Sequence, residues 1–458
     1  MGMKVLKSNK YEIDMCSGSI MDKLISFSLP LMLSGILQLM FNAVDIVIVG
    51  RFTGSEALAA VGSTSALINM FTNLFIGISL GSNVLAARYY ASGRTKEMSE
   101  TVHTAILFAL LSGIVMAFVG LIFSRFALEL MGTPDNVIEH STLYMRIYFL
   151  GMPFFMLYNY GASILRAVGD TKRPLLFLII SGVLNAGLNM FLVIVFHLGV
   201  AGVAIATVIS QMVSCVLVLR CLYLSDGSYQ LRFSRLTLKW NYLKPIFQVG
   251  IPAGIQSTVI NFSNVLLQSS VNSFGSTAMA GYTAANNILS FLYVSVNSVT
   301  QACMSFTSQN YGVGNYKRMD KILVNCIALS VSVSLALGCI AYFFGPEILS
   351  IYTSDPEVIR CGVEVLAYTT VTYFLCGLMD LFPGPMRGMG HSAVPMLMSI
   401  IGTVGTRIVW IFLLFPQNRT LAFLFISYPA SWIVTILLQV VCLYFVRKKV
   451  YPTSARQR

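Results

Sequence analysis

The sequence predicts an all-α integral membrane protein, with twelve transmembrane helices in two parallel six-helix repeats (an N-lobe and a C-lobe). Of its 458 residues, 56% are hydrophobic and only 10% are charged, whereas a soluble domain carries about 25% charged residues. The apolar residues gather in runs long enough to cross a bilayer, which takes about 20 residues each. An internal repeat is the third observation. Together the runs leave no room for a soluble catalytic domain.

The predicted helices follow one another with short connections. In the first half they cover 24–49, 57–87, 102–124, 141–165, 174–197 and 199–224. In the second half they cover 245–272, 278–310, 323–345, 361–386, 395–416 and 420–446. The first run is too long for the core of a signal peptide and lacks a small-residue cleavage site, so we expect it to remain as the first helix.

Basic residues lie mainly in every second loop. The net charge is +12, with 30 Lys and Arg against 18 Asp and Glu, and the positive-inside rule places most basic residues on the cytoplasmic side. Both termini are then cytoplasmic, and the basic excess does not require a nucleic-acid partner. The predicted parts are a cytoplasmic N-terminus (1–23), the N-lobe (24–224), a cytoplasmic linker (225–244), the C-lobe (245–446) and a cytoplasmic basic tail (447–458).

The two halves repeat each other at an offset of 221 residues, which relates Gly54 to Gly275 and Arg166 to Arg387. The same offset relates Tyr90 to Tyr311, Gly93 to Gly314, Gly169 to Gly390 and Pro174 to Pro395. Because six helices are an even number, the two halves enter the membrane from the same side, an arrangement typical of alternating-access transporters. The Arg-containing turns are interpreted as structural, with Arg complementing the last carbonyls of a helix and Gly permitting the turn.

Asp45 is the first candidate functional residue, because a carboxylate inside a span costs about 2.5–3.5 kcal/mol at mid-depth and usually faces a cavity or a partner. Ser34, Gln38, Asn42 and Asp45 are spaced so that they share one face of the first helix. The amides alone could serve only as hydrogen-bonding contacts between helices. Such a contact does not need a charge, so Asp45 favours a functional interpretation.

Polar stripes on other helices outline a hydrated central cavity. Ser181, Asn185 and Asn189 recur every four residues on one helix, while Leu267 stands where Asp45 would repeat. The two lobes are therefore predicted to be chemically unequal. The residues predicted to line the substrate cavity are Gln38, Asn42, Asn264, Asn297, Gln301, Asp380 and Arg407.

Asp380 and Arg407 are charges inside the C-lobe helices. An unpaired guanidinium at that depth is costly, so a partner is expected, and Asp380 is one candidate. Such a pair could be structural or could be a gate. The nine cysteines and four histidines show no disulfide, metal-ligand or catalytic spacing, so we expect no metal site, no cofactor and no enzyme activity.

The internal repeat, the Asn42-x-x-Asp45 element with Gly50, and the LRAVGDTKRP stretch from Leu165 to Pro174 resemble bacterial members of the multidrug and toxic compound extrusion (MATE) family. The resemblance covers nearly the whole chain. It implies an ion-coupled antiporter in the bacterial plasma membrane that acts as a single chain. Its partners would be the lipid bilayer and organic cations or amphipathic drugs, which leave the cell in exchange for H⁺ or Na⁺.

The family's ion-coupling site falls by position on Asp45, Asn185, Asn189 and Thr207. The chain departs from the family pattern at Asn189, where many members have a carboxylate. Because a proton needs only Asp45, whereas sodium could use Asp45 together with neutral oxygens, the departure favours protons. A glutamate that some sodium-coupled members carry on the seventh helix is also missing.

Three alternatives to a drug antiporter remain open. A flippase for lipids or lipid-linked oligosaccharides could share this architecture, but it would need several basic residues in its cavity, where only Arg407 is available. A membrane enzyme would need a nucleophile–base or metal constellation, and none is visible. A passive channel would conduct without a gradient.

Overall fold

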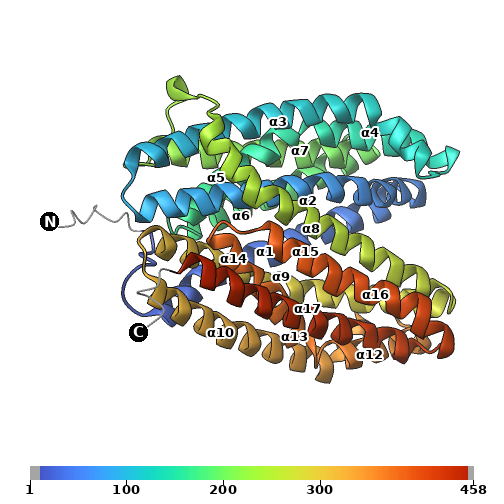
Figure 1. The fold of residues 1–458 in the computed structure, drawn as a ribbon. Helices are drawn as coiled ribbons and strands as arrows, with labels where there is room; N and C mark the ends of the chain where they lie inside the picture. The colour runs from blue at the N-terminus through green and yellow to red at the C-terminus, as the bar shows by residue number, and fades with distance from the viewer. Residues whose placement is uncertain (1–10, 452–458) are drawn as a thin grey trace. The chain divides into compact units, whose positions relative to one another are not determined.

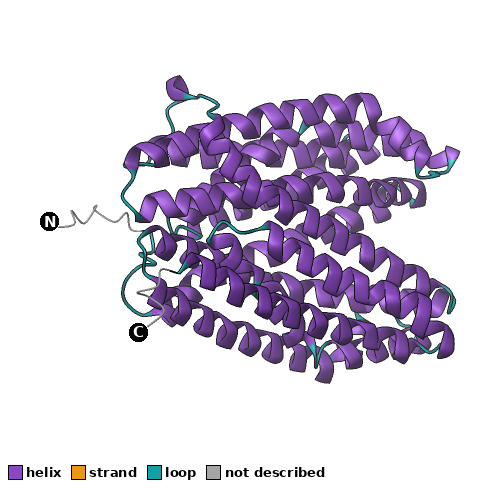
Figure 2. Ribbon diagram, in the orientation of Figure 1, coloured by secondary structure: helices purple, strands orange, loops and turns teal. Residues whose placement is uncertain are grey.

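The structure is a computed structural model that describes residues 11–451. Within this range every regular element is a helix (Figure 2), so the predicted all-α class is confirmed. The chain forms two compact units. Unit 1 holds residues 11–14 and 33–250, and unit 2 holds residues 15–32 and 251–451.

Unit 1 contains the C-terminal part of the first helix and six further α-helices (Figure 1). They are α1 (Ile20–Phe52, from Leu33), α2 (Ser55–Ala91), α3 (Thr95–Leu130), α4 (Asp135–Leu150), α5 (Met152–Ala167), α6 (Lys172–Met190) with the π-helical η1 (Phe191–Val195), and α7 (Gly199–Leu224). A 3₁₀ turn, η2 (Phe233–Arg235), and the start of α8 follow. The predicted helix 141–165 is two helices, α4 and α5. Pro153 near the start of α5 lacks the N–H that a continuous helix would need there.

Unit 2 begins with residues 15–32 and continues from Ile251 within α8. Its elements are α8 (Trp240–Asn272), α9 (Ser276–Gly312), α10 (Tyr316–Phe343), α11 (Gly345–Ser350), α12 (Pro356–Thr369), α13 (Tyr373–Leu381), α14 (Pro383–Gly388), α15 (Ala393–Ser399), η3 (Ile400–Gly405), α16 (Thr406–Val409), η4 (Trp410–Leu414), η5 (Phe415–Gln417) and α17 (Leu421–Val450). The predicted helix 361–386 is therefore broken into three, with a bend of 52° between α12 and the α13–α14 segment.

The backbone repeats as the sequence does. α2 and α9 have the same length of 37 residues, and both begin after a glycine with nearly the same positive φ, 95° at Gly54 and 97° at Gly275. The turns at Gly169 and Gly390 match in the same way, with φ of 93° and 89°. These left-handed conformations are open to glycine and strained for most other residues. The repeat is thus built into the turns as well as the helices.

Eight of the described helices are each long and apolar enough to cross a membrane, or nine if the bent pair α12 and α13–α14 counts as one span. The other predicted spans lie on α4–α5, α8 and α9. α4 and α5 are each too short alone, and α8 and α9 carry many amide and hydroxyl side chains that lower their hydropathy.

The two compact units and the two predicted lobes assign two short segments differently. Residues 15–32 belong to unit 2, because Arg318 donates to the backbone oxygens of Met15, Ser17 and Gly18 and Phe27 packs edge-on against Phe306. The linker and the first residues of α8, up to Gly250, belong to unit 1.

Candidate functional site

Polar residues gather around Asp45 inside unit 1. α1 contributes Asp45, and α6 contributes Asn185 and Asn189. The Nδ2 group of Asn189 donates both to Oδ1 of Asp45 and to Oδ1 of Asn185, the latter at 3.2 Å. Asn189 is fully buried, Asn185 is 6% exposed and Asp45 is half-buried. The structure therefore brings three of the four predicted ion-coupling residues into one hydrogen-bonded chain.

Thr207, the fourth predicted residue, lies on α7 and is half-buried. Its hydroxyl donates to the backbone oxygen of Val203 at 3.0 Å, and in the described structure it makes no hydrogen bond to Asp45 or to the two asparagines. Two acceptors near this cluster lack a partner among the described residues: Oδ1 of Asn189 and Oε1 of Gln211, one turn beyond Thr207 on α7. Unpaired buried acceptors are rare and indicate a missing donor or cation.

Sequence reasoning missed two tyrosines on α4 of the same unit. The rings of Tyr144 and Tyr148 stack with centroids 6.2 Å apart, and the charge of the Asp45 carboxylate acts on both hydroxyl groups. Their spacing of four residues on a predicted helix was the available signal. Nothing in the sequence indicated which helix their face would meet.

The two amides of the α1 stripe, Gln38 and Asn42, are exposed. They make no hydrogen bond with the described part of the chain. Exposed amides in a helix of this apolarity are expected to face water or a ligand, because lipid cannot satisfy their donors and acceptors.

In unit 2 a similar chain of amides ends on Asp380 of α13. Asn297 of α9 donates to Oδ2 of Asp380 at 2.8 Å, and Gln301 donates to Oδ1 of Asn297 at 2.9 Å. The structure thus brings together three of the residues predicted to line the cavity. The arrangement parallels the Asp45 cluster, with an amide bound to a carboxylate and a second amide bound to the first.

Arg387 differs from its expected role at the end of a helix. Its side chain is 8% exposed, and its Nη2 donates to Oε1 of Gln256 on α8 at 2.8 Å. Gln256 in turn donates to the hydroxyl of Ser399, which also accepts from Gln439. Arg387 is therefore part of a buried network between helices, and not only a complement to helix carbonyls. The sequence could not indicate this because the partner lies 131 positions away.

Arg407 and Asp380 form no ion pair in the described structure. Arg407 lies on α16 and donates instead to the neutral oxygens of Ser263, Asn264 and Ser431. The pairing with Asp380, which the sequence leaves open, is not formed in this conformation, since Asp380 is held by Asn297. Asn264 and Arg407, both predicted to line the cavity, do contact each other.

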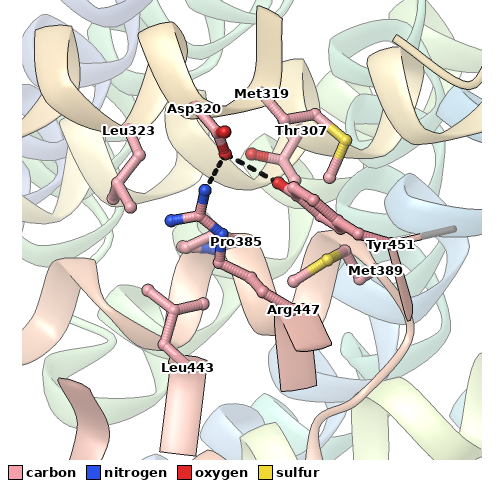
Figure 3. Close-up of a pocket in the computed structure, with 9 residues that line it drawn as sticks. All are labelled: Thr307, Met319, Asp320, Leu323, Pro385, Met389, Leu443, Arg447 and Tyr451. Atoms are coloured by element: carbon pink, nitrogen blue, oxygen red, sulfur yellow. Dashed lines mark hydrogen bonds and ion pairs between the residues drawn. The ribbon is translucent and has the colours of Figure 1, made fainter. Parts of the chain in front are cut away.

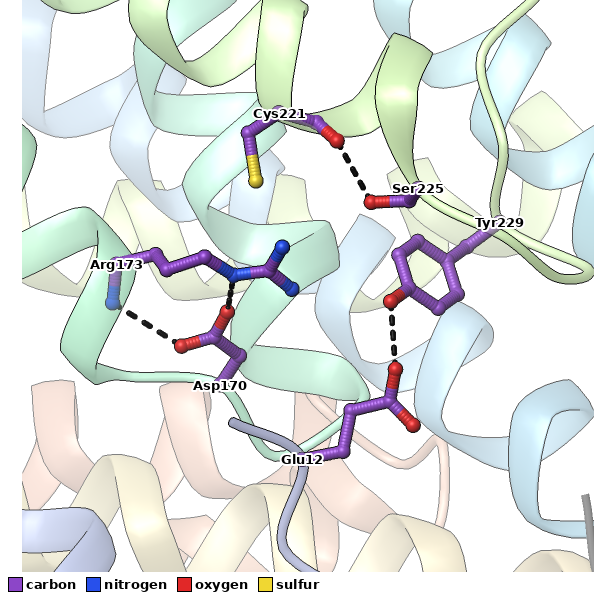
Figure 4. Close-up of polar contacts among 6 residues, drawn as sticks. All are labelled: Glu12, Asp170, Arg173, Cys221, Ser225 and Tyr229. Carbon is purple, nitrogen blue, oxygen red and sulfur yellow. Dashed lines mark hydrogen bonds and ion pairs between the residues drawn. The ribbon is translucent and has the colours of Figure 1, made fainter. Parts of the chain in front are cut away.

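A second polar cluster lies where unit 1 receives the N-terminal segment (Figure 4). Asp170, at the turn between α5 and α6, accepts from the backbone N–H and the guanidinium of Arg173. Burial raises the pKa of the Asp170 carboxyl, and the charge of Arg173 opposes that rise. Glu12 accepts from the hydroxyls of Tyr90 and Tyr229 at 2.7 and 2.6 Å. This cluster fastens residues 11–14 to unit 1.

The corresponding region of unit 2 contains a small pocket (Figure 3). At its centre Asp320 of α10 accepts from Arg447 of α17 and from the hydroxyl of Tyr451 at 2.8 Å. The pocket is lined by Thr307, Met319, Asp320, Leu323, Pro385, Met389, Leu443, Arg447 and Tyr451. The ion pair joins the first turns of α10 to the last turn of α17. It is a packing contact at a helix end.

No group of three or more His, Cys, Asp or Glu among the described residues could hold a metal ion. A monovalent cation would have to use Asp45 with neutral oxygens such as Oδ1 of Asn189. What the Asp45 cluster can do chemically is to take up and release one positive charge inside a helical bundle.

Comparison with known proteins gives a consistent result. The family model described as MatE matches residues 30–191 and again residues 252–413, one match in each repeat. The chain is 31% identical to the "Probable multidrug resistance protein YoeA" of Bacillus subtilis, over 92% of this chain and 93% of that one. It is 23% identical to the "Multidrug export protein MepA" of Staphylococcus aureus, over 82% of this chain and 83% of that one.

The fold is also similar to solved structures. One is described as an outward-facing conformation of a multidrug resistance MATE family transporter, and it superposes with a TM-score of 0.88 at 20% identity, over 99% of this chain and 100% of that one. At that identity the likeness establishes the fold alone. It confirms the two-lobe arrangement of twelve helices. The long apolar helices and the family match together indicate a multi-pass membrane protein.

Proposed function

The chain belongs to the MATE family of multidrug efflux transporters, and we propose that it is a secondary active antiporter that exports organic cations and amphipathic drugs in exchange for protons. The names of the relatives support the substrate class. The observation that carries the proposal is the hydrogen-bonded chain from Asp45 through Asn189 to Asn185 in unit 1.

The Asp45 cluster supports coupling to an ion because it has one group that can change charge. When Asp45 is ionised, the amide of Asn189 donates to it. When Asp45 carries a proton, its hydroxyl becomes a donor, and Oδ1 of Asn189 is an acceptor that has no partner in the described structure. The same neighbours can therefore bind both forms of Asp45, in two different arrangements.

Alternating access follows if the two forms of Asp45 favour different packings of α1 against α6. An ion can shift a conformational equilibrium only through its different affinity for the two conformations. Thr207 and the exposed amides of Gln38 and Asn42 would then line the route by which a substrate reaches Asp45 and competes with the proton for it.

Protons are favoured over sodium because Asp45 is the one carboxylate among the four predicted residues. Sodium would need several neutral oxygens beside it, such as those of Asn189 and Thr207. The Nδ2 group of Asn189 now faces both Asp45 and Asn185, so this amide would have to turn before a cation could bind there. A proton needs only the carboxylate.

The test is transport in proteoliposomes that contain the purified protein. Ethidium movement is followed under an imposed proton gradient and, separately, under a sodium gradient, for the wild type, Asp45→Asn and the control Asp226→Asn, which changes an exposed carboxylate outside the helices. We expect the proton gradient to drive transport in the wild type and in Asp226→Asn. Asp45→Asn should lose it, because an amide cannot exchange a proton.

Three results would contradict parts of the proposal. Transport that survives in Asp45→Asn would exclude Asp45 as the coupling residue. Transport driven only by the sodium gradient would identify sodium, and not the proton, as the coupling ion. Absence of cation transport under either gradient would favour a lipid flippase instead.

Asn189→Asp sharpens the choice of ion. It supplies the second carboxylate that many family members have, and two carboxylates with neutral oxygens make a better sodium site. We expect this variant to gain sodium-driven transport. An unchanged ion dependence would mean that Asn189 does not contribute to ion selection.

The placement in the cell is part of the same proposal. We propose a single chain in the bacterial plasma membrane, with both termini in the cytoplasm and the segments 24–224 and 245–446 as the moving lobes. The distribution of basic residues supports this orientation. A reporter enzyme fused after Arg458, active only in the cytoplasm, tests the orientation, and light scattering of the purified protein tests the single-chain state.

A further inference from the structure

Arg407 is a buried cation for which the proposed coupling mechanism has no use. It is 3% exposed and lies on α16, a stretch of only four α-helical residues between the π-helical segments η3 and η4. π-helical turns are rare and are frequently found at functional sites. The local backbone therefore marks this position independently of its side chain.

All the protein partners of Arg407 are neutral. Its Nε donates to the hydroxyl of Ser431, and its Nη1 donates to the hydroxyl of Ser263 and, at 2.7 Å, to Oδ1 of Asn264. The guanidinium also lies over the ring of Tyr428, at 4.7 Å from the ring centroid. Among the described residues no carboxylate balances the charge.

One edge of the guanidinium remains open. Nη2 makes no hydrogen bond to the described part of the chain, and it is not among the polar atoms that are fully enclosed without a partner. Beside it, Asn264 is only half-buried. Nη1 and Nη2 together form the fork that binds a carboxylate or a phosphate through two parallel hydrogen bonds.

A purely structural role does not explain this arrangement. A neutral side chain of similar length could fill the same space without the cost of placing a charge in an apolar bundle. Two serines, an amide and a tyrosine ring orient the guanidinium and leave its charge in place. An oxyanion that enters past Asn264 would supply the missing counter-charge.

We propose that Arg407 is the binding point for an oxyanion, namely the carboxylate of a zwitterionic amphipathic substrate, in a subsite of unit 2. The proposal rests on the proposed export function and assigns to Arg407 the recognition of the carboxylate in substrates that carry both charges. The bound carboxylate replaces Oδ1 of Asn264 on Nη1 and adds a second hydrogen bond from Nη2.

A matched pair of dyes tests the subsite: a fluorescent rhodamine free acid and its methyl ester, which differ only in the carboxylate. Binding is measured by fluorescence anisotropy with detergent-purified protein, and transport is measured in proteoliposomes. Removal of a charge-assisted hydrogen bond should weaken binding by roughly tenfold. We therefore expect Arg407→Gln to lower acid binding by about that factor while ester binding stays within about twofold.

Asn264→Asp is the second variant, because Arg407→Gln could fail to fold. It places a carboxylate of the protein against Nη1, so the charge of Arg407 is balanced, and we expect the fold to be preserved. The internal carboxylate should exclude the acid as effectively as Arg407→Gln does. The ester has no carboxylate to be repelled and is a cation, so it should bind at least as tightly as it does to the wild type. Equal loss of acid and ester in both variants would overturn the proposal and make Arg407 structural.

A lipid phosphate could offer the same chemistry as a substrate carboxylate. Melting temperatures with phosphatidylglycerol and with phosphatidylcholine separate these sources. One result would assign the oxyanion to a lipid and overturn the proposal of a substrate carboxylate. In that result phosphatidylglycerol raises the melting temperature of the wild type but not of Asn264→Asp, and the wild type binds the acid no better than the ester. The binding assay needs no gradient. It therefore still shows whether Arg407 binds the carboxylate even if the wild type transports neither dye and the proposed export function is wrong.

Discussion

Asp45 in unit 1 and Leu267 in unit 2 occupy corresponding places in the two repeats, and their surroundings are opposite. In this first helix of each repeat the offset is 222 residues, as it is between the two family matches, which begin at residues 30 and 252. Asp45 is half-buried and hydrogen-bonded to Asn189. Leu267 is 1% exposed and belongs to an apolar cluster that also contains Tyr282 and Leu289. The two repeats therefore share their helices and turns but differ in the side chains that pack between the helices.

Unit 2 carries its charges on other helices, at Asp380 of α13 and Arg407 of α16. Asp380 has an amide partner, as Asp45 has, but it shares its unit with two buried arginines, Arg387 and Arg407. Unit 1 thus offers a cluster suited to a cation, whereas unit 2 also offers one suited to an anion. Four substitutions test how strongly the stability and transport of the protein depend on this difference.

Leu267→Asp should have the largest effect, because it copies the acid of unit 1 into the apolar cluster of unit 2. The charge costs about 2.5–3.5 kcal/mol, and the lost apolar packing adds roughly 2–5 kcal/mol. We expect a strong loss of melting temperature and yield in detergent. Leu267→Met is the matched control and should cost less than about 1.5 kcal/mol. Equal melting of the two variants would show that unit 2 tolerates the acid.

Asp170→Ala should rank second. The Asp170 side chain has no exposed surface, and that of Arg173 is 17% exposed, so the substitution leaves a largely buried cation without its partner. Breaking such a pair costs about 3–5 kcal/mol. The exposed Asp226 of the same unit provides the control, and Asp226→Ala should stay within about 0.5 kcal/mol. Thermal unfolding of both variants measures the difference.

Gly182→Ala should have an intermediate effect on the Asp45 cluster. A methyl group at Gly182 of α6 would collide with the ring of Phe41 on α1, one turn before Asp45, and overpacking of this kind costs about 1–3 kcal/mol. We expect slower proton-driven ethidium transport together with a lower melting temperature. Gly187→Ala on the same helix has nothing within 4 Å of the new methyl group. It should be neutral, and equal effects of the two would contradict the packing argument.

Arg447→Gln should have the smallest effect. The Arg447 and Asp320 side chains are 33% and 43% exposed, and ion pairs with this much solvent contact contribute about 0–1 kcal/mol. The melting temperature should therefore fall by far less than in Asp170→Ala, and the difference should shrink further at high salt. A loss as large as that of Asp170→Ala would mean that the two clusters are equivalent, which their exposure does not predict.

The helices and the repeat were predictable because hydropathy and glycine spacing are local properties of the chain. Asp45 was predictable because a carboxylate in an apolar helix is conspicuous. The partners of Arg407 were not, since Ser263, Asn264 and Ser431 meet it only where α8, α16 and α17 cross. The π-helical segments beside it also escaped prediction, because their hydrogen-bond pattern depends on packing and not on composition.

The paired glycine turns limit how the two repeats can diverge. Gly93 and Gly314, with φ of 69° and 71°, hold the same left-handed turn in both repeats, as the other glycine pairs do, and a side chain at either position would strain its repeat. These joints constrain both repeats equally, while each interior is free to mutate. One repeat can then lose an acid and the other acquire a base without any change in architecture, so that a single gene encodes two binding chemistries on one scaffold.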